Sequence, residues 1–111
     1  MPKVFIPQVP SRFDRATQMW VPVVNLQSAE RFGQLVTLLP PEANRMHVAP
    51  LVAAMKEKLT EVSPDDWLLA VGDPSLIGAA CVLFARKCNY QLRVLRWDKF
   101  TSSYFPVEIQ L

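Results

Sequence analysis

The sequence predicts an α/β fold: a small mixed sheet with a parallel β-α-β-α-β centre, flanked by two β-hairpins at the N- and C-termini. Two apolar runs, Gln34–Leu39 and Trp67–Val71, have the length and composition of buried strands. Each precedes a longer stretch in which apolar residues recur at helical spacing. The 111 residues are enough for one hydrophobic core and too few for two, so we expect a single domain over residues 1–111.

The N-terminal segment predicts a hairpin over about Val4–Leu26, with its turn at Asp14–Gln18. The chain has ten prolines against three glycines, and most of the prolines lie in apolar stretches such as Val4–Pro10 and Trp20–Val24. Because proline has no N–H to donate to a central ladder, we expect these stretches to be edge or irregular strands.

A short helix over Ala29–Phe32, capped by Ser28 and stopped by Gly33, is expected to lead into the strand Gln34–Leu39. After Pro40 and Pro41 the pattern predicts a longer helix over about residues 49–62. Its apolar residues at helical spacing are Leu51, Val52, Met55, Leu59 and Val62.

The loop Ser63–Asp66, whose Asp65-Asp66 pair we interpret as solvated, leads into the strand Trp67–Val71. Asp73 is a good N-cap for a helix over Pro74–Lys87, which is apolar nearly all round and is therefore expected to be the most buried helix. Right-handed crossovers between these elements imply three parallel strands, which the hairpins extend to a mixed sheet of about five.

The two ends of the chain carry the same motif. Residues 12–23 read RFDRATQMWVPV and residues 96–107 read RWDKFTSSYFPV, identical at five positions and chemically similar at three more. Asp and Thr side chains bond backbone amides across tight turns, and aromatic residues pair across strands, so the motif predicts a hairpin. The second hairpin is thus expected at Gln91–Leu111, with its turn at Asp98–Ser103. Two interpretations stay open: a duplicated functional element, or two unrelated hairpins that converged on good turn chemistry.

The composition argues against several classes of site. Three glycines cannot form a glycine-rich phosphate loop. The single histidine, His47, and the two cysteines, Cys81 and Cys88, lack zinc-ligand spacing, and we expect the cysteines to be buried thiols. No nucleophile and base are evidently paired. We therefore expect neither catalysis nor a metal or cofactor.

Charge and hydropathy bear on partners and location. The net charge of +2 is too weak to indicate nucleic-acid binding by itself. The longest apolar run, Leu76–Ala85, is half the length of a membrane span, and the N-terminus lacks the pattern of a secretory signal. These features predict a cytoplasmic protein without a membrane partner.

The first candidate site lies at the carboxyl ends of the parallel strands, where open α/β sheets bind ligands. Two loops emerge there, each beside a helix N-terminus that favours anions. Asp73 is better explained as a helix cap whose charge would repel an anion, and His47 as a polar residue near a helix start. The residues that the two loops would bring together are Asn44, Arg45, His47, Asp73 and Ser75.

The second candidate surface is the C-terminal hairpin, where basic and aromatic residues interleave. Cations for phosphate contact and rings for base stacking are what single-stranded nucleic acid needs. The competing interpretation is a cross-strand aromatic pair, Trp97 with Tyr104, surrounded by a solvated basic rim. The residues of this surface are Arg93, Arg96, Trp97, Lys99 and Tyr104.

Four stretches of the chain carry a resemblance to a known group of proteins. They are Leu38–Arg45, Leu69–Pro74, Arg96–Asp98 and Tyr104–Glu108. In these stretches the sequence resembles short proteins of unknown function that are encoded by tailed bacteriophages. The resemblance implies a viral origin and a host-cytoplasm setting, and it favours an interaction protein over an enzyme.

We therefore expect a non-catalytic accessory protein that binds a host or viral macromolecule through its aromatic and basic hairpins. A protein is the expected partner, and nucleic acid would bind weakly. The alternative is a small-ligand or nucleotide binder that uses the strand-end loops. A pocket with Arg45 and His47 pointing inward would favour the ligand binder, whereas loops packed shut would favour the interaction protein. The sequence does not predict an oligomeric state.

Overall fold

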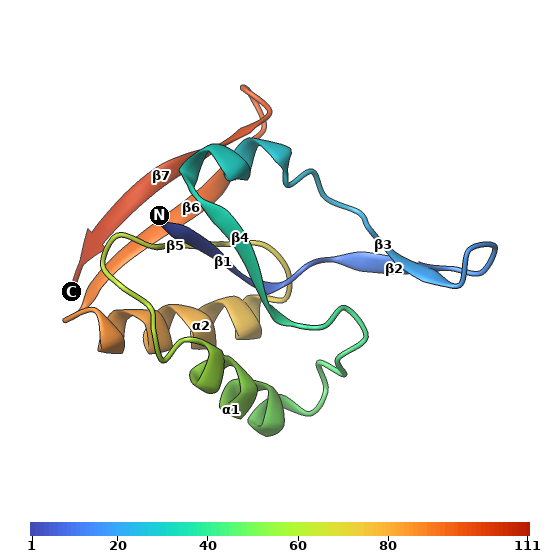
Figure 1. Ribbon diagram of the computed structural model, residues 1–111, viewed down its shortest axis with the longest axis horizontal. Coiled ribbons are helices and arrows are strands. Elements are labelled where there is room, and N and C mark those ends of the chain that lie inside the picture. Colours follow the sequence, from blue (N-terminus) through green and yellow to red (C-terminus); the bar gives the residue numbers. More distant parts are fainter.

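The fold is built on a five-stranded sheet in the order β4-β1-β5-β6-β7, seen in a computed structural model that describes residues 1–111 (Figure 1). Strands β1, β4, β5 and β6 are parallel, and β7 pairs antiparallel with β6. The predicted mixed α/β sheet with a parallel centre and a C-terminal hairpin is confirmed. The strands are β1 (Lys3–Gln8), β4 (Gln34–Leu39), β5 (Trp67–Leu69), β6 (Gln91–Asp98) and β7 (Ser103–Gln110).

Strand β1 departs most from prediction, because it lies inside the sheet and is not part of an N-terminal hairpin. It pairs in parallel with both β4 and β5, and five of its six residues are buried. The expectation that Val4–Pro10 forms an edge or irregular strand was therefore wrong. Pro7 is tolerated there because β5 pairs only with Val4 and Phe5, so Pro7 lies beyond that ladder.

The N-terminal hairpin is shorter than predicted and stands apart from the main sheet. Strands β2 (Ser11–Asp14) and β3 (Met19–Pro22) pair with each other in a separate two-stranded sheet. Figure 1 shows this hairpin, which we call the arm, projecting from the end of the molecule. The turn at Asp14–Gln18 lies where the sequence predicts it.

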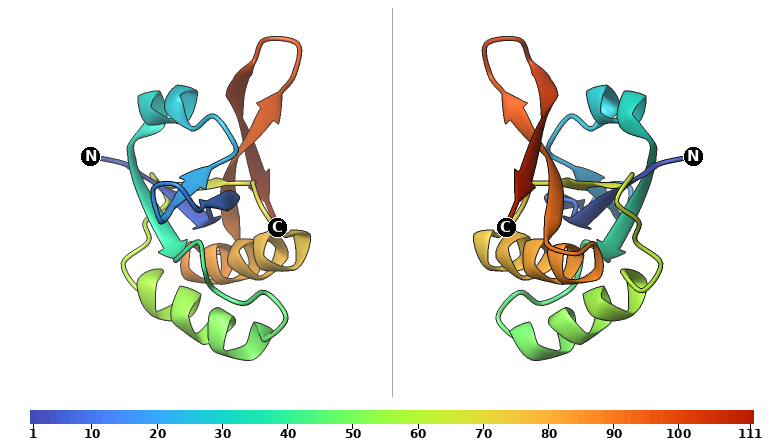
Figure 2. Two further views of the ribbon diagram at one scale, coloured as in Figure 1. Left: turned by 90° about the vertical axis from the view of Figure 1, so that its right-hand side faces the viewer. Right: turned by 90° about the vertical axis from the view of Figure 1, so that its left-hand side faces the viewer.

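The two faces of the sheet are covered differently (Figure 2). Helices α1 (Val48–Lys58) and α2 (Pro74–Lys87) pack on one face, and the 3₁₀ helix η1 (Gln27–Phe32) lies on the other. Helix α2 has the predicted bounds, while α1 ends four residues earlier than expected. None of the helices is long and apolar enough to cross a membrane.

One predicted helix cap does not form. Ser28 lies inside η1, and its hydroxyl accepts the backbone N–H of Tyr104 at 3.3 Å. The Ser28 side chain thus joins η1 to β7 instead of closing a helix end. The cap at Asp73 does form, since its carboxylate accepts the backbone N–H groups of Ser75 and Leu76 at 3.0 and 3.3 Å.

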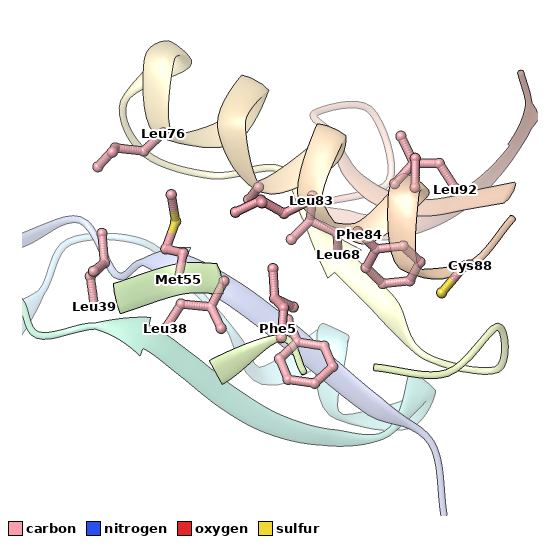
Figure 3. Packing of buried hydrophobic residues seen from close by; sticks show 13 residues of the cluster. Phe5, Leu38, Leu39, Met55, Leu68, Leu76, Leu83, Phe84, Cys88 and Leu92 are labelled. Carbon is pink, nitrogen blue, oxygen red and sulfur yellow. The ribbon is translucent and has the colours of Figure 1, made fainter. Parts of the chain in front are cut away.

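Two hydrophobic clusters form the core, one on each face of the sheet. The larger contains 13 buried residues between the sheet and the helices α1 and α2, among them Phe5, Leu68 and Phe84 (Figure 3). The smaller, beside η1, contains Val4, Ile6, Ala29, Trp67, Leu69, Leu95 and Tyr104. Because side chains alternate between faces along a strand, both faces of β1, β5 and β6 are buried.

The Asp65-Asp66 pair is solvated only in part. Asp65 is exposed, but Asp66 is buried, and its carboxylate accepts the backbone N–H groups of Lys3 at 2.8 Å and Ser63 at 2.9 Å. The interpretation of both residues as solvated was therefore wrong. Asp66 fastens the start of β1 to the loop before β5. Both cysteines are free. Cys88 is buried, as expected, whereas Cys81 is only partly buried. Burial raises the pKa of each thiol, and the Asp66 carboxylate raises the pKa of Cys88 further.

Helix α2 provides a test of the fold. Ala80 is fully buried in the larger cluster, whereas Val82 on the same helix is 57% exposed. The helix is the most buried one, as expected, but its apolar residues extend onto an exposed side. The variant Ala80→Asp should lose about 4 kcal/mol or more of unfolding free energy, since it buries a charge without a partner. Val82→Asp is the matched control and should melt near the wild-type temperature. Thermal denaturation measures the melting temperatures of the two variants. Equal losses of stability in both would contradict this packing of α2.

Candidate functional site

A groove of about 700 Å³ lies at the carboxyl ends of β1, β4 and β5. It occupies the switch point of the sheet, because the chain leaves β1 toward one face and leaves the neighbouring β5 toward the other. Three of the five residues proposed for this site, Asn44, Arg45 and Asp73, line the groove. His47 and Ser75 are exposed outside its lining.

The inner end of this groove is held by the buried side chain of Gln8. Its amide N–H groups donate to the carbonyl oxygens of Pro40 at 2.9 Å and Ala43 at 3.3 Å. The Asn44 side chain accepts the Met46 N–H at 2.9 Å, and the Asp73 carboxylate is engaged in its cap. The side chains of Gln8, Asn44 and Asp73 are thus engaged in hydrogen bonds that hold the strand-end segments in place. No pattern in the sequence indicates this role for Gln8.

The tips of the two hairpins have the same backbone geometry at equivalent positions. We call residues 12–21 the arm tip and residues 96–105 the sheet tip. In both, an Asp pairs across the strands with the residue that follows a four-residue loop: Asp14 with Met19, and Asp98 with Ser103. The fourth loop residue has a positive φ in each, 59° at Gln18 and 50° at Ser102.

The hydrogen bonds of the two tips also match. Each Asp accepts the backbone N–H of the residue two positions later at 3.0 Å, Ala16 in the arm tip and Phe100 in the sheet tip. Each Asp also accepts the hydroxyl of a Thr, at 3.1 Å in the arm tip and 3.0 Å in the sheet tip. The shared motif therefore specifies one hairpin geometry, which the structure contains twice.

An aromatic pair flanks each turn, with one ring on either strand, but the two pairs differ in exposure. In the arm tip, Phe13 and Trp20 stack with centroids 5.6 Å apart, and both are exposed. In the sheet tip, Trp97 and Tyr104 meet edge to face at 5.0 Å. Trp97 is 40% exposed, whereas Tyr104 is buried and donates its hydroxyl to the carbonyl of Asn25. Burial raises the pKa of Tyr104, so its hydroxyl stays protonated as a donor.

The end of the sheet tip is hollowed and carries unpaired cations. A shallow depression of about 490 Å³ is lined by Arg96, Trp97, Asp98, Lys99, Phe100 and Phe105. The Arg96 guanidinium lies 4.7 Å from the Phe105 ring centroid, and the Lys99 ammonium 5.5 Å from that of Phe100. Phe100 is 88% exposed. Sequence reasoning did not select Phe100 and Phe105, although the loop position of Phe100 was a signal for its exposure.

Arg93 and Tyr104 do not belong to this exposed end. The Arg93 guanidinium stacks on Trp67 at 3.6 Å, donates to the Pro64 carbonyl at 3.3 Å and forms with Glu108 the one ion pair of the structure. Tyr104 is part of the smaller core cluster. Of the five residues proposed for this surface, the structure gathers three: Arg96, Trp97 and Lys99. No group of three or more His, Cys, Asp or Glu side chains is placed to hold a metal ion.

Comparison with known proteins identifies the chain's relatives. The model of the Phage Pam3 gp32-like protein family matches residues 2–111, which is nearly the whole chain. The chain therefore belongs to this family, which confirms the resemblance to phage proteins. No match was found among curated proteins or among solved structures.

The turn carboxylates can be tested by substitution. Asp98→Ala should lower the free energy of unfolding by about 0.5 to 2 kcal/mol, by analogy with a lost helix cap. Asp98→Asn keeps an acceptor for the Phe100 N–H and should lose less. In the arm, Asp14→Ala should instead speed amide hydrogen exchange in β2 and β3, because a lone two-stranded sheet opens locally. Unchanged exchange and melting in both Ala variants would contradict the role of the two carboxylates.

Proposed function

We propose that this member of the Phage Pam3 gp32-like protein family is a non-catalytic accessory protein that binds a macromolecule in the host cytoplasm through the arm tip and the sheet tip. A protein is the partner that we propose first. The observation that carries the proposal is the pair of matched tips, each of which has an exposed aromatic ring and two exposed cations without a carboxylate partner.

The composition of the tips supports a protein partner. Exposed Phe13, Met19 and Trp20 lie on the arm, and exposed Trp97 and Phe100 lie on the sheet tip. Aromatic residues, Met and Arg are enriched at protein–protein interfaces, and Trp and Arg are frequent hot spots of binding energy. At the sheet tip, Arg96 lies 4.7 Å from the Phe105 ring centroid and Lys99 lies 5.5 Å from that of Phe100, so cations lie beside rings there. The arm tip carries two exposed cations of its own, Arg12 and Arg15.

The free edge of β7 is a poorer binding element than the tips. The Leu95 carbonyl accepts the Ala70 N–H, so the Leu95 backbone faces away from β7. Pro106, which pairs with Leu95, therefore turns its ring nitrogen toward the free edge of β7. Because this nitrogen has no proton to donate, the middle of the edge is protected against an added strand.

The strand-end groove supports the alternative, a small-ligand binder, only weakly. It lies at the switch point, where such sites occur, and exposed Arg45 lines it. Its inner end is nevertheless closed by the bonds of Gln8 to the prolines of the loop, and Asp73 supplies a negative charge at the N-terminus of α2. These features favour the interaction protein.

A bait experiment tests the proposal. Tagged wild-type protein and the variants Phe100→Ser and Met46→Ser are incubated with host lysate, and retained proteins are quantified by mass spectrometry. Both positions are almost fully exposed, 88% and 86%, so neither change should affect folding. Phe100→Ser should reduce retention of a partner about 10-fold or more, since hot-spot rings contribute about 2 kcal/mol. Met46→Ser, in the groove, should retain it. If Met46→Ser alone fails to retain the partner, the binding surface is the strand-end groove and not the sheet tip.

A titration with labelled single-stranded oligonucleotides tests the nucleic-acid alternative. Arg93 is engaged with Trp67 and Glu108, so at the sheet tip only Arg96 and Lys99 are free to contact phosphates. We expect weak binding whose log affinity falls with log salt at a slope of roughly −1.4 for two contacts. Micromolar or tighter binding that survives moderate salt would contradict the choice of a protein partner.

A further inference from the structure

We infer that the arm tip and the sheet tip are two copies of one recognition element, and that their partner is a protein that presents the same acidic site twice, related by a rotation. The inference rests on the proposed function, because it assigns the class of partner for the same two tips. It also decides between duplication and convergence for the repeated motif.

The turn itself requires only part of the shared motif. The Asp and Thr of each tip are engaged in the turn, at 14 and 17 and at 98 and 101. Convergence on good turn chemistry explains why these residues recur. It does not explain residues of the motif whose side chains the turn does not use.

Two cations recur at positions where the turn does not need them. Arg12 and Arg15 in the arm tip correspond to Arg96 and Lys99 in the sheet tip. All four are exposed, and none has a carboxylate partner, since the one ion pair of the structure is elsewhere. The cations therefore repeat for a reason outside the hairpin, and binding to a common target supplies one.

The charges of the tips define the chemistry of that target. The carboxylates of Asp14 and Asp98 accept hydrogen bonds within their turns and form no ion pair, so each tip holds two exposed cations against one carboxylate, a net charge of +1, and also carries an exposed ring. The complementary site is an acidic surface with a hollow for an aromatic side chain. A second copy of this chain fits poorly, because its own tips carry the same charge.

The directions of the tips define the symmetry of that target. Figure 1 shows the arm and the β6–β7 hairpin projecting from the molecule in different directions. Sites repeated by translation alone would face the same way, and one molecule could not place both tips on them in the same manner. Sites related by rotation face different ways, as they do in closed homo-oligomers. Both must fall within the span of one molecule, 45 × 35 × 24 Å.

Matched double variants of the full chain test the inference. Arg12→Ala/Arg15→Ala removes the cations of the arm tip, Arg96→Ala/Lys99→Ala those of the sheet tip, and Lys56→Ala/Lys58→Ala on α1 is the control of equal charge. All six side chains are exposed, so the variants should fold. Each serves as bait for host lysate. Losing one of two linked contacts lowers avidity by about 10-fold or more, so both tip variants should lose the same protein to a similar degree.

A loop exchange and the oligomeric state of the captured protein complete the test. Exchanging residues 15–18 with residues 99–102 moves the exposed Phe100 to the arm tip and Ala16 to the sheet tip, in loops of one length and one geometry. Because the two tips would contact identical sites, the captured protein should be retained to the same degree as by the wild type. Sedimentation of the purified protein should show a homo-oligomer. A monomer without an internal repeat, capture of a second copy of this chain, or a loop exchange that abolishes retention would overturn the inference.

The outcomes separate the inference from the proposed function. If the two tip variants lose different proteins, or only one of them loses any, the proposed function stands and the inference is wrong. If the two tip variants retain every protein that the Lys56→Ala/Lys58→Ala control retains, the inference and the proposed function are both wrong.

Discussion

The insertion of β1 between β4 and β5 is the constraint on which the rest of the structure depends. By pairing with both neighbours, β1 brings the first residues of the chain into the centre of the sheet and supplies side chains to both core clusters. Asp66 fastens its start and Gln8 its end, each through hydrogen bonds to a neighbouring loop. Because β1 ends at the switch point, the chain must leave the sheet there before it can return as β4, and the arm is this excursion.

The sequence predicted those features that depend on local chemistry. The bounds of α2 followed from the Asp73 cap and the apolar run, and β4 followed from its unbroken apolar pattern. The geometry of both tips followed from the repeated Asp and Thr residues. In these cases the residues that determine the structure lie within a few positions of one another, so the local sequence pattern is sufficient to predict it.

The features that depend on distant partners were not predictable in this way. Nothing near Val4–Gln8 shows that β4 and β5 will flank this segment, and Pro7 within it favoured an edge strand. Asp66 looked solvated because one of its two partners, the Lys3 N–H that ties it to β1, is 63 positions away. Tyr104 and Arg93 were assigned to an exposed surface because η1 and Trp67, which cover them, come from elsewhere in the chain. Of the proposed surface, the residues that stay exposed are those nearest the turn.

The two tips differ from the rest of the molecule in combining exposed aromatic rings with a repeated pair of cations, whereas the polar groups at the strand ends fasten loops to one another. A direct measurement of this difference is photo-crosslinking in host lysate, with a photoreactive phenylalanine placed at Phe100, at Ala16 or at Met46. We expect protein adducts from positions 100 and 16, and few from position 46 in the groove. Adducts from position 46 alone would contradict this expectation, because they would place the binding surface at the strand-end groove.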